Sequence, residues 1–307
     1  MAVALGDCSC YGKGMRGWPN LSELLVARDS NAPVGLVGAP LAAGSVTPGS
    51  CDLAPALLRE TLRRIGRYDI ETKREISTRI VDRGDVEIAG MTIEQATGPI
   101  REAVQFSAAL HELTLVVGGN NAVTRPAVLG LGMPLERVGL ITLDAHFDMR
   151  DTHEGLSNGN PVRALINDGL PGANIAQIGL AAFANSRRMH EDAVAAGNLV
   201  ITIGEVGLNG VPRAIERALS HVEHCEAIVV DCDIDVIDRS QLPGAPGARP
   251  GGMAVADFFN AVRYLASQRK VRVIDLTEWD PPLDTTDLSA LTAARWVAEC
   301  LSGYELR

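Results

Sequence analysis

The sequence predicts a three-layer α/β/α fold, in which one mainly parallel sheet of eight strands is covered by helices on both faces. Short apolar segments alternate with longer amphipathic ones along most of the chain, as expected when parallel strands are joined by crossover helices. The short segments are apolar at nearly every position, which is typical of strands that are buried on both faces. Half-exposed antiparallel strands would instead alternate apolar and polar residues.

The predicted strands are rich in Val, Ile and Leu and end in polar or glycine-containing turns. They span residues 34–40, 78–84, 113–119, 137–144, 174–180, 199–204, 227–235 and 271–278. The amphipathic segments between them predict helices that include 53–65, 92–111, 187–196, 210–222, 255–268 and 287–301. Residues 1–32 lack periodicity and are predicted to form an N-terminal arm, whereas residues 33–307 contain no linker and are predicted to form a single domain.

The composition describes a soluble globular protein, since 46% of the 307 residues are hydrophobic and 21% are charged. The formal net charge of −10 argues against nucleic acid or an anionic membrane as a partner, because both attract basic surfaces. No apolar run reaches the roughly 20 residues that cross a bilayer, and the N-terminus lacks the pattern of a signal peptide. We therefore expect a cytoplasmic protein in which all six cysteines, Cys8 and Cys10 included, are free thiols.

The segment LITLDAHFDMRD (140–151) places three ionisable side chains where a predicted strand ends. Asp144, His146 and Asp148 occupy alternate positions, and alternate residues of an extended strand point the same way. In open parallel sheets the working site lies beyond the carboxyl ends of the strands. This segment is therefore predicted to form part of a functional site.

Two more predicted strands end in acidic residues. They are VVDCDIDVID (229–238), with Asp231, Asp233, Asp235 and Asp238, and LTEWDPPLD (276–284), with Glu278, Asp280 and Asp284. An Asp at a strand end can simply cap the next helix, but two alternating acidic triads, one of them with a His, are poorly explained by capping. Carboxylates gathered at one sheet edge would repel one another unless divalent cations lay among them.

The ligand types favour manganese. Oxygen ligands with a single imidazole suit Mn²⁺ better than Zn²⁺, which prefers more nitrogen or sulfur. Two cations bridged by carboxylates would also lower the pKa of a shared water and produce hydroxide at neutral pH. The sequence therefore predicts a hydrolytic metal centre.

Four motifs resemble, in order and spacing, the signatures of the ureohydrolases, the superfamily of arginases, agmatinases and formimidoylglutamases. They are GGNNAVTRP (118–126), DAHFD (144–148), DCDIDVID (231–238) and EWDPPLD (278–284), and segment 38–59 resembles the family's N-terminal loop and first helix. The resemblance implies that residues 33–307 form an arginase-like catalytic domain with two Mn²⁺ ions. It also implies hydrolysis of an amidine or guanidine C–N bond, and a homo-oligomer that is a trimer or a hexamer.

The resemblance further implies a role for each motif residue. Asp144 and Asp233 would bridge the two metal ions, His146 and Asp235 would complete one metal site, and Asp148 would serve the other. Asp148 would also accept a hydrogen bond from the metal-bridging hydroxide and pass its proton to the leaving nitrogen.

Glu278 would hold the cationic amidinium group of the substrate by a charge-assisted hydrogen bond.

The sequence departs from the family pattern at GGNNA, where the family usually reads GGDHS. Asn121 stands in the place of a metal-ligating His, and Asn120 in that of an Asp. An amide oxygen can bind a hard cation, but it is a weaker ligand than imidazole. We therefore expect the metal site of Asn121 and Asp148 to be the weaker one.

Segments LSNGNPVRAL (156–165) and IGLAAFANS (178–186) resemble the formimidoylglutamase branch more than arginases or agmatinases. They imply the hydrolysis of N-formimidoyl-L-glutamate to L-glutamate and formamide, a step of histidine degradation. Arg150 is the best candidate to meet the two substrate carboxylates, with Asn158 and Arg163 behind it, although Arg163 could simply face solvent. Two alternatives stay open: a guanidinobutyrase or agmatinase that releases urea, and a non-catalytic protein of the same fold with a weakened metal site.

Overall fold

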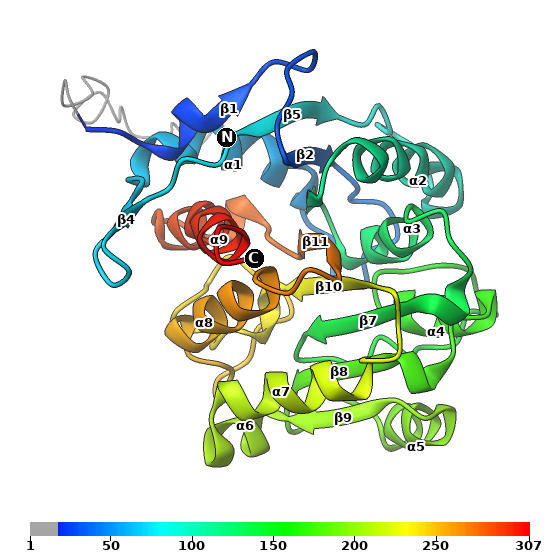
Figure 1. Ribbon diagram of the computed structural model, residues 1–307. Coiled ribbons are helices and arrows are strands. Elements are labelled where there is room, and N and C mark those ends of the chain that lie inside the picture. The colour runs from blue at the N-terminus through cyan, green and yellow to red at the C-terminus, as the bar shows by residue number, and fades with distance from the viewer. Residues whose placement is uncertain (1–17) are drawn as a thin grey trace.

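The computed structural model describes residues 18–307, and a nine-stranded sheet forms the middle layer of the molecule (Figure 1). All neighbouring strands in this sheet are parallel. In spatial order the strands are β1 (Leu25–Val26), β5 (Ile80–Asp85), β2 (Val34–Ala39), β6 (Leu113–Gly118), β11 (Val271–Thr277), β10 (Ala227–Asp233), β7 (Val138–Leu143), β8 (Ile175–Leu180) and β9 (Leu199–Thr202). A separate antiparallel pair is formed by β3 (Tyr68–Asp69) and β4 (Arg74–Glu75).

The predicted α/β architecture is confirmed, and the sheet has one strand more than the predicted eight. The extra strand is β1, which pairs with β5 at the sheet edge, so that Leu25 lies opposite Ile80. A strand of two residues is too short to give a periodic signal in the sequence. The nearby Leu21 and Leu24 are buried in the core, so this part of the predicted arm packs against the body.

Helices cover both faces of the sheet (Figure 1). One face carries α1 (Ala54–Thr61), α6 (Ile203–Asn209), α7 (Val211–His221), α8 (Val255–Ala266) and α9 (Leu288–Tyr304). The other face carries α2 (Ile93–Leu110), α3 (Thr124–Leu129), α4 (Pro161–Asp168) and α5 (Arg187–Ala196). Each layer buries its own apolar cluster against the sheet, which gives the protein two cores separated by the strands.

Capping residues fix where two of these helices begin. Thr92 and Gln95 form a reciprocal capping box at the start of α2, and Thr202 and Glu205 form another at the start of α6. The second box also ends β9 at Thr202, because the next residues are already helical. The predicted strand 199–204 is therefore two residues too long.

The register of the central strands brings their carboxyl ends to one level. Cys232 of β10 is level with Leu143 of β7, and Asp233 is level with Thr277 of β11. The residues that directly follow β7 and β11 therefore leave the sheet on either side of Asp233. This alignment is what places three acidic motifs, far apart in sequence, around one spot.

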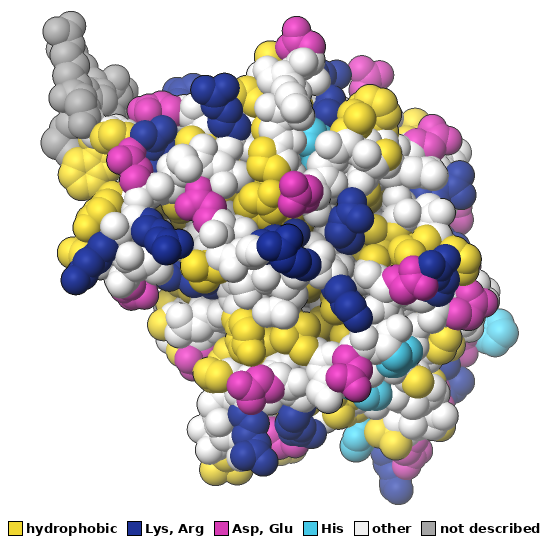
Figure 2. Space-filling model, viewed as in Figure 1, with side chains coloured by type: hydrophobic (Ala, Val, Ile, Leu, Met, Phe, Trp, Pro, Cys, Tyr) yellow, Lys and Arg dark blue, Asp and Glu magenta, His cyan; other side chains and the backbone are white. Residues whose placement is uncertain are grey.

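Two further properties concern the surface and the cysteines. On the face shown in Figure 2, basic and acidic side chains are interspersed rather than separated into large patches. No helix within residues 18–307 is long and apolar enough to cross a membrane. Cys51, Cys225, Cys232 and Cys300 are buried free thiols, whereas the predicted free thiols at positions 8 and 10 lie outside the described residues.

Candidate metal centre

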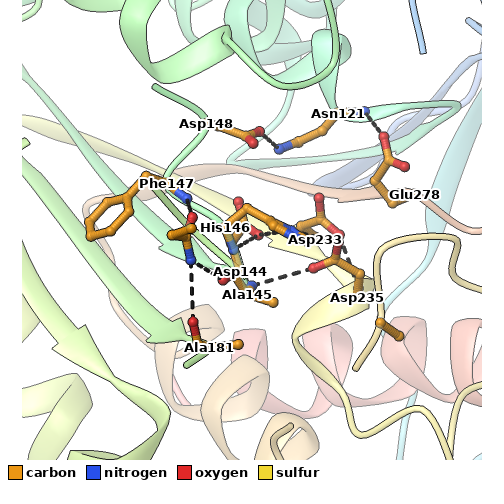
Figure 3. A network of polar contacts seen from close by, with 12 residues as sticks. Asn121, Asp144, Ala145, His146, Phe147, Asp148, Ala181, Asp233, Asp235 and Glu278 are labelled. Carbon is orange, nitrogen blue, oxygen red and sulfur yellow. Dashed lines mark hydrogen bonds and ion pairs between the residues drawn. The ribbon is translucent and has the colours of Figure 1, made fainter. Parts of the chain in front are cut away.

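Asp144, His146 and Asp235 form a compact group at the carboxyl ends of β7 and β10 (Figure 3). One ligand atom from each lies within 4.8 Å of the other two. His146 Nδ1 lies 2.9 Å from Asp235 Oδ2, and Asp144 Oδ1 accepts a 2.7 Å hydrogen bond from the His146 amide. Asp233 adjoins the group, since its Oδ1 accepts a 2.9 Å bond from the Asp235 amide. The structure thus brings together four residues that the motifs singled out.

Asp148 and Asn121 form a pair beside this group (Figure 3). Asn121 begins a short 3-10 helix (Asn121–Val123) after β6, and its Nδ2 donates a 2.6 Å hydrogen bond to Asp148 Oδ2. Its Oδ1 accepts bonds from the hydroxyls of Thr124 and Thr277, at 2.8 and 2.9 Å. The nitrogen of the side-chain amide, and not its oxygen, therefore faces Asp148.

Glu278 follows β11 and is held from two sides. Its Oε1 accepts hydrogen bonds from the Asn121 backbone amide at 2.7 Å and from Asn158 Nδ2 at 2.9 Å. No hydrogen bond between described residues ends at Oε2, so this oxygen is available to a ligand. Asn158 Oδ1 accepts the Val46 amide at 2.7 Å, so both ends of the Asn158 amide are engaged in orienting Glu278 and the neighbouring loop.

Asp148 and Glu278 share an unusual left-handed backbone, with φ of 51° and 61°. For residues other than glycine this conformation costs on the order of 1–3 kcal/mol and persists only where the surroundings hold it. Here the Asp148 carbonyl accepts the Arg163 amide at 3.1 Å, and the Glu278 amide donates to the Gly119 carbonyl at 2.9 Å. Such strain at two residues of one pocket is typical of functional sites.

Burial is the main influence on the carboxylates of this group. Because removal from water disfavours the charged form, the pKa of Asp144 rises to about 6 and the pKa of Glu278 to about 7. Burial, together with neighbouring carboxylates, also raises the pKa values of Asp148 and Asp233 well above their usual range. The cluster therefore resists full ionisation unless a countercharge is supplied.

The exception is the pair of Asp235 and His146. Burial alone would raise the pKa of Asp235, but the adjacent His146 more than offsets this and leaves the pKa below its usual value. For His146, burial lowers the pKa, whereas the Asp235 and Asp144 carboxylates raise it to about 11. The two residues thus stabilise each other as an ion pair, which a cation held by the same atoms would replace.

Two observations test whether a cation fits here. Asp144 Oδ2 is completely buried and has no hydrogen-bond partner among residues 18–307, an arrangement that costs a carboxylate several kcal/mol unless a cation or proton meets it. The donor set around it, carboxylate oxygens with one imidazole, suits Mn²⁺. Asp144, His146, Asp233 and Asp235 therefore fit a metal ion. The orientation of the Asn121 amide fits one less well, because an NH₂ group cannot act as a ligand.

A cavity of about 150 Å³ adjoins these residues. Its lining combines the acidic Asp148, Asp233 and Glu278 with two arginines, Arg150 and Arg249, whose residues are exposed. Neither arginine forms a salt bridge with any described residue. The cavity therefore has an acidic inner part and two cations available at its solvent side.

Gly247 lies on a Gly- and Pro-rich loop, residues 239–253, that covers one side of the cavity. A Cβ atom built at Gly247 would lie 1.9 Å from Asp235 Oδ2 and 3.0 Å from His146 Cε1. Arg239 holds this loop by donating a 2.8 Å hydrogen bond to the Ala245 carbonyl. Only glycine allows the loop to approach the acidic group this closely.

Other residues singled out in the sequence lie elsewhere. The Arg163 guanidinium pairs with Asp192 and does not line the cavity, so Arg163 acts here through its backbone amide alone. Asp280 and Asp284 accept hydrogen bonds from nearby backbone amides and stabilise loops. Asp231 is buried within the sheet, below the level of the cavity.

Two residues near the cavity were missed by the sequence reasoning. Arg249 is one, and Asn185 is the other. Asn185 Oδ1 accepts the Phe147 amide at 2.9 Å, and its Nδ2 donates to the Ala145 carbonyl at 2.9 Å, which holds the segment after β7 in place. Neither residue belongs to an acidic motif. Asn185 lies in segment 178–186, which was noted only for its resemblance to one branch of the family, and Arg249 is an arginine within a Gly- and Pro-rich loop.

Comparison with known proteins decides the family. A model of the arginase family matches residues 32–303, most of the chain. The chain belongs to the arginase family. The resemblance inferred from the four motifs is thereby confirmed, as is the arginase-like fold.

Relatives of this family member carry more specific names. The formimidoylglutamase of Bacillus subtilis (strain 168) is 28% identical over 294 residues, which cover 93% of this chain and 92% of the relative. A formimidoylglutamase of Halalkalibacterium halodurans is 28% identical over 275 residues, 88% of this chain and 86% of that one. The crystal structure of the Bacillus subtilis enzyme superposes with a TM-score of 0.90 at 27% identity, covering 95% of this chain and 93% of that chain.

A more distant structure shares the fold and contains manganese. Trypanosoma cruzi formiminoglutamase, solved with Mn²⁺, superposes with a TM-score of 0.86 at 22% identity and covers 94% of this chain and 99% of that chain. At this identity the likeness concerns the fold alone.

Proposed function

We propose that the protein hydrolyses N-formimidoyl-L-glutamate to L-glutamate and formamide. Its membership of the arginase family and its similarity to formimidoylglutamases over nearly the whole chain support this reaction. The observation that carries the proposal is the charge layout of the cavity, with carboxylates inside and, at the solvent side, two arginines that form no salt bridge within residues 18–307. The substrate has the complementary layout, a cationic amidinium group at one end and two carboxylates at the other.

The proposed cofactor is Mn²⁺, with two ions per subunit. Asp144 and Asp233 would contribute to holding both ions, and His146 and Asp235 would complete the site for which the donor set fits best. Asp148 and Asn121 would serve the second and weaker site. When bound, manganese lowers the pKa of a bound water, which supplies a nucleophile at neutral pH.

The residues of the chain position the substrate and move its protons. Glu278 Oε2 accepts a charge-assisted hydrogen bond from the amidinium group, while Asn121 and Asn158 keep the carboxylate in place through Oε1. Water attacks the formimidoyl carbon, and the bond from this carbon to the glutamate nitrogen breaks. Asp148, buried and with a raised pKa, carries the proton from the water to the leaving nitrogen.

Arg150 and Arg249 are proposed to bind the two substrate carboxylates. Both side chains line the cavity and neither has an anionic partner among the described residues. Agmatine has no carboxylate, so this feature disfavours an agmatinase. A guanidino acid would still fit one arginine, and urea release is therefore the main alternative to formamide release.

Three further proposals concern location, assembly and partner. We propose a cytoplasmic location, which agrees with the four buried free thiols, and a homo-oligomer of three or six subunits, for which only the family resemblance argues. The net charge of −10 supports a small molecule, and not nucleic acid or a membrane, as the partner.

The direct test uses protein loaded with Mn²⁺. Formamide and glutamate formed from N-formimidoyl-L-glutamate would be followed by proton NMR, and urea would be assayed with 4-guanidinobutyrate and agmatine. We expect equal amounts of formamide and glutamate, and bound manganese by elemental analysis. Urea from a guanidine, with no formamide, would replace this proposal by the ureohydrolase alternative. Full metal loading without any turnover would favour the non-catalytic one.

A further inference from the structure

The side-chain amide of Asn121 is held in one orientation. Three hydrogen bonds fix it: Oδ1 accepts from Thr124 Oγ1 and Thr277 Oγ1, and Nδ2 donates to Asp148 Oδ2. All of these groups are buried. In this orientation Asn121 offers only N–H groups to the space beside Asp148, where the second metal ion is proposed to lie (Figure 3).

Hydroxyl groups can reverse this arrangement without loss. A threonine hydroxyl donates one hydrogen bond and accepts others, whereas an amide oxygen only accepts and an amide nitrogen only donates. If the Asn121 amide makes a half-turn, its two N–H groups face the oxygens of Thr124 and Thr277, which then act as acceptors. Its oxygen would face Asp148, and two oxygens can share that space only with a cation or a proton between them.

Asp275 distinguishes Thr124 from Thr277. This residue of β11 is completely buried, and within the described part of the chain neither of its carboxylate oxygens has a hydrogen-bond partner. Burial raises the pKa of Asp275 to about 7, whereas Asp231, the Cys232 backbone amide and Thr124, in that order, act to lower it, so the Thr124 side chain is one of the polar groups near this carboxylate. The Thr124 proton, however, is directed at Asn121 Oδ1. After a half-turn of the amide, that proton becomes free to satisfy Asp275.

We propose that Thr124 is a positioning residue that couples cation binding at Asp148 to the orientation of Asn121. With a cation bound, the Asn121 oxygen points at the cation and Thr124 transfers its hydrogen bond from Asn121 to Asp275. This inference rests on the proposed function, because it presupposes a cation beside Asp148. It identifies Thr124 and Asp275, which are not ligands, as determinants of the affinity of the weaker metal site.

Thr277 provides a matched control. Thr277 makes one hydrogen bond with Asn121 in either orientation, so replacing it by Val removes one bond from each state. Thr124→Val removes one bond from the present orientation but two from the turned one. The two substitutions have the same size and chemistry, yet only the change at Thr124 should act on metal affinity.

The experiment is a Mn²⁺ titration of the full chain followed by electron paramagnetic resonance, which reports free Mn²⁺. We expect wild-type protein to bind one ion firmly and a second more weakly. Thr124→Val should weaken the second site about tenfold and leave the first unchanged, Thr277→Val should change neither appreciably, and Thr124→Ser should restore wild-type binding. In an Asn121→Ala background, Thr124→Val should have no further effect.

The results distinguish a failure of the proposed function from a failure of the proposed role of Thr124. If wild-type protein binds no manganese, the proposed function itself fails. If it binds two ions and Thr124→Val leaves both affinities as they were, only the role of Thr124 is lost. Equal weakening by Thr124→Val and Thr277→Val, or failure of serine to restore binding, would also overturn it. The unchanged first site shows that each variant is folded.

Discussion

At the amino edge of the central sheet, Arg272 donates hydrogen bonds to the carbonyls of Ala108, His111 and Glu112, where α2 ends and β6 is about to begin. Donors and acceptors are matched there. At the carboxyl edge of the same sheet, buried carboxylates gather with few matching donors, and Asp144 Oδ2 has no hydrogen-bond partner in the part of the chain that the structure describes. The same strands therefore end in a satisfied polar network on one side and in an unsatisfied one on the other.

This contrast indicates that the amino edge of the sheet contributes mainly to stability and the carboxyl edge mainly to function. Charged groups that meet carbonyls at helix ends complete hydrogen bonds that the backbone cannot make alone. Carboxylates that meet only one another weaken the fold until a ligand supplies the missing charge. We therefore expect substitutions at the carboxyl edge to affect catalysis, and substitutions at the amino edge to affect stability.

The largest effect is expected for Asp235→Ala. Loss of this carboxylate removes a proposed metal ligand and the partner of His146, so kcat/KM should fall by more than about 100-fold, since loss of even an outer-shell partner costs 10–100-fold. Steady-state kinetics and manganese content would be measured together. Glu226→Ala, which breaks an exposed pair with Arg137 far from the site, is the control. Normal turnover by the Asp235 variant would contradict the assigned site.

Arg150→Ala should act on substrate binding. Loss of a charge-assisted hydrogen bond of about 2 kcal/mol corresponds to a rise in KM of roughly 30-fold, with a smaller change in kcat. Arg163→Ala is the matched control, because that guanidinium pairs with Asp192 outside the cavity. An equal effect of both substitutions on KM would argue against a carboxylate site at Arg150.

Glu278→Gln tests whether the buried Glu278 carboxylate lowers the free energy of unfolding when it is ionised. The raised pKa of Glu278 means that its protonated form stabilises the folded state, and this contribution is lost as pH rises from about 4 through about 7. In chelator, the variant should gain roughly 3 kcal/mol of unfolding free energy over wild type on going from pH 4 to pH 8, because each unit of pKa shift corresponds to about 1.4 kcal/mol. Urea denaturation at both pH values measures this gain, and the variant should lose activity. A gap that does not depend on pH would be evidence against a buried ionising group.

Arg272→Ala tests the opposite edge. Removing three hydrogen bonds of a half-buried guanidinium should lower the unfolding free energy by about 2 kcal/mol and leave kcat/KM unchanged. Arg213→Ala, at an exposed position of α7, should change neither quantity. A fall in kcat/KM with unchanged stability would remove the division between the two edges.

The smallest effect is expected for His111→Gln, also at the amino edge. Burial lowers the pKa of His111, and Arg83, which donates to Nε2, lowers it further against the Ala32 carbonyl. Since the unfolded chain takes up this proton more readily, stability should fall as pH drops below about 6.5. This change of unfolding free energy with pH is opposite in sign to the change caused by Glu278. His111→Gln should make it smaller. An unchanged slope between pH 7 and pH 5 would exclude His111 as its source.

Much of the fold could be predicted from the sequence, because buried parallel strands have a distinct composition. It also located the acidic group, since alternating residues after a strand must share a face, as Asp144 and His146 do. Other features could not be read in this way. The left-handed backbone of Asp148 depends on hydrogen bonds from distant segments, and Arg249 reaches the cavity from a loop without periodicity. The orientation of the Asn121 amide depends on hydroxyls from two separate elements.

Gly247 has a consequence for how the cavity could be reshaped. The covering loop touches Asp235 through bare backbone, so even one added methyl group would force the loop outward. Gly247→Ala would then act as a wedge that widens the entrance and admits bulkier amidines, at the expense of solvent exclusion. The hydrogen atom that Gly247 carries in place of a side chain thus lets this loop close over the acidic group.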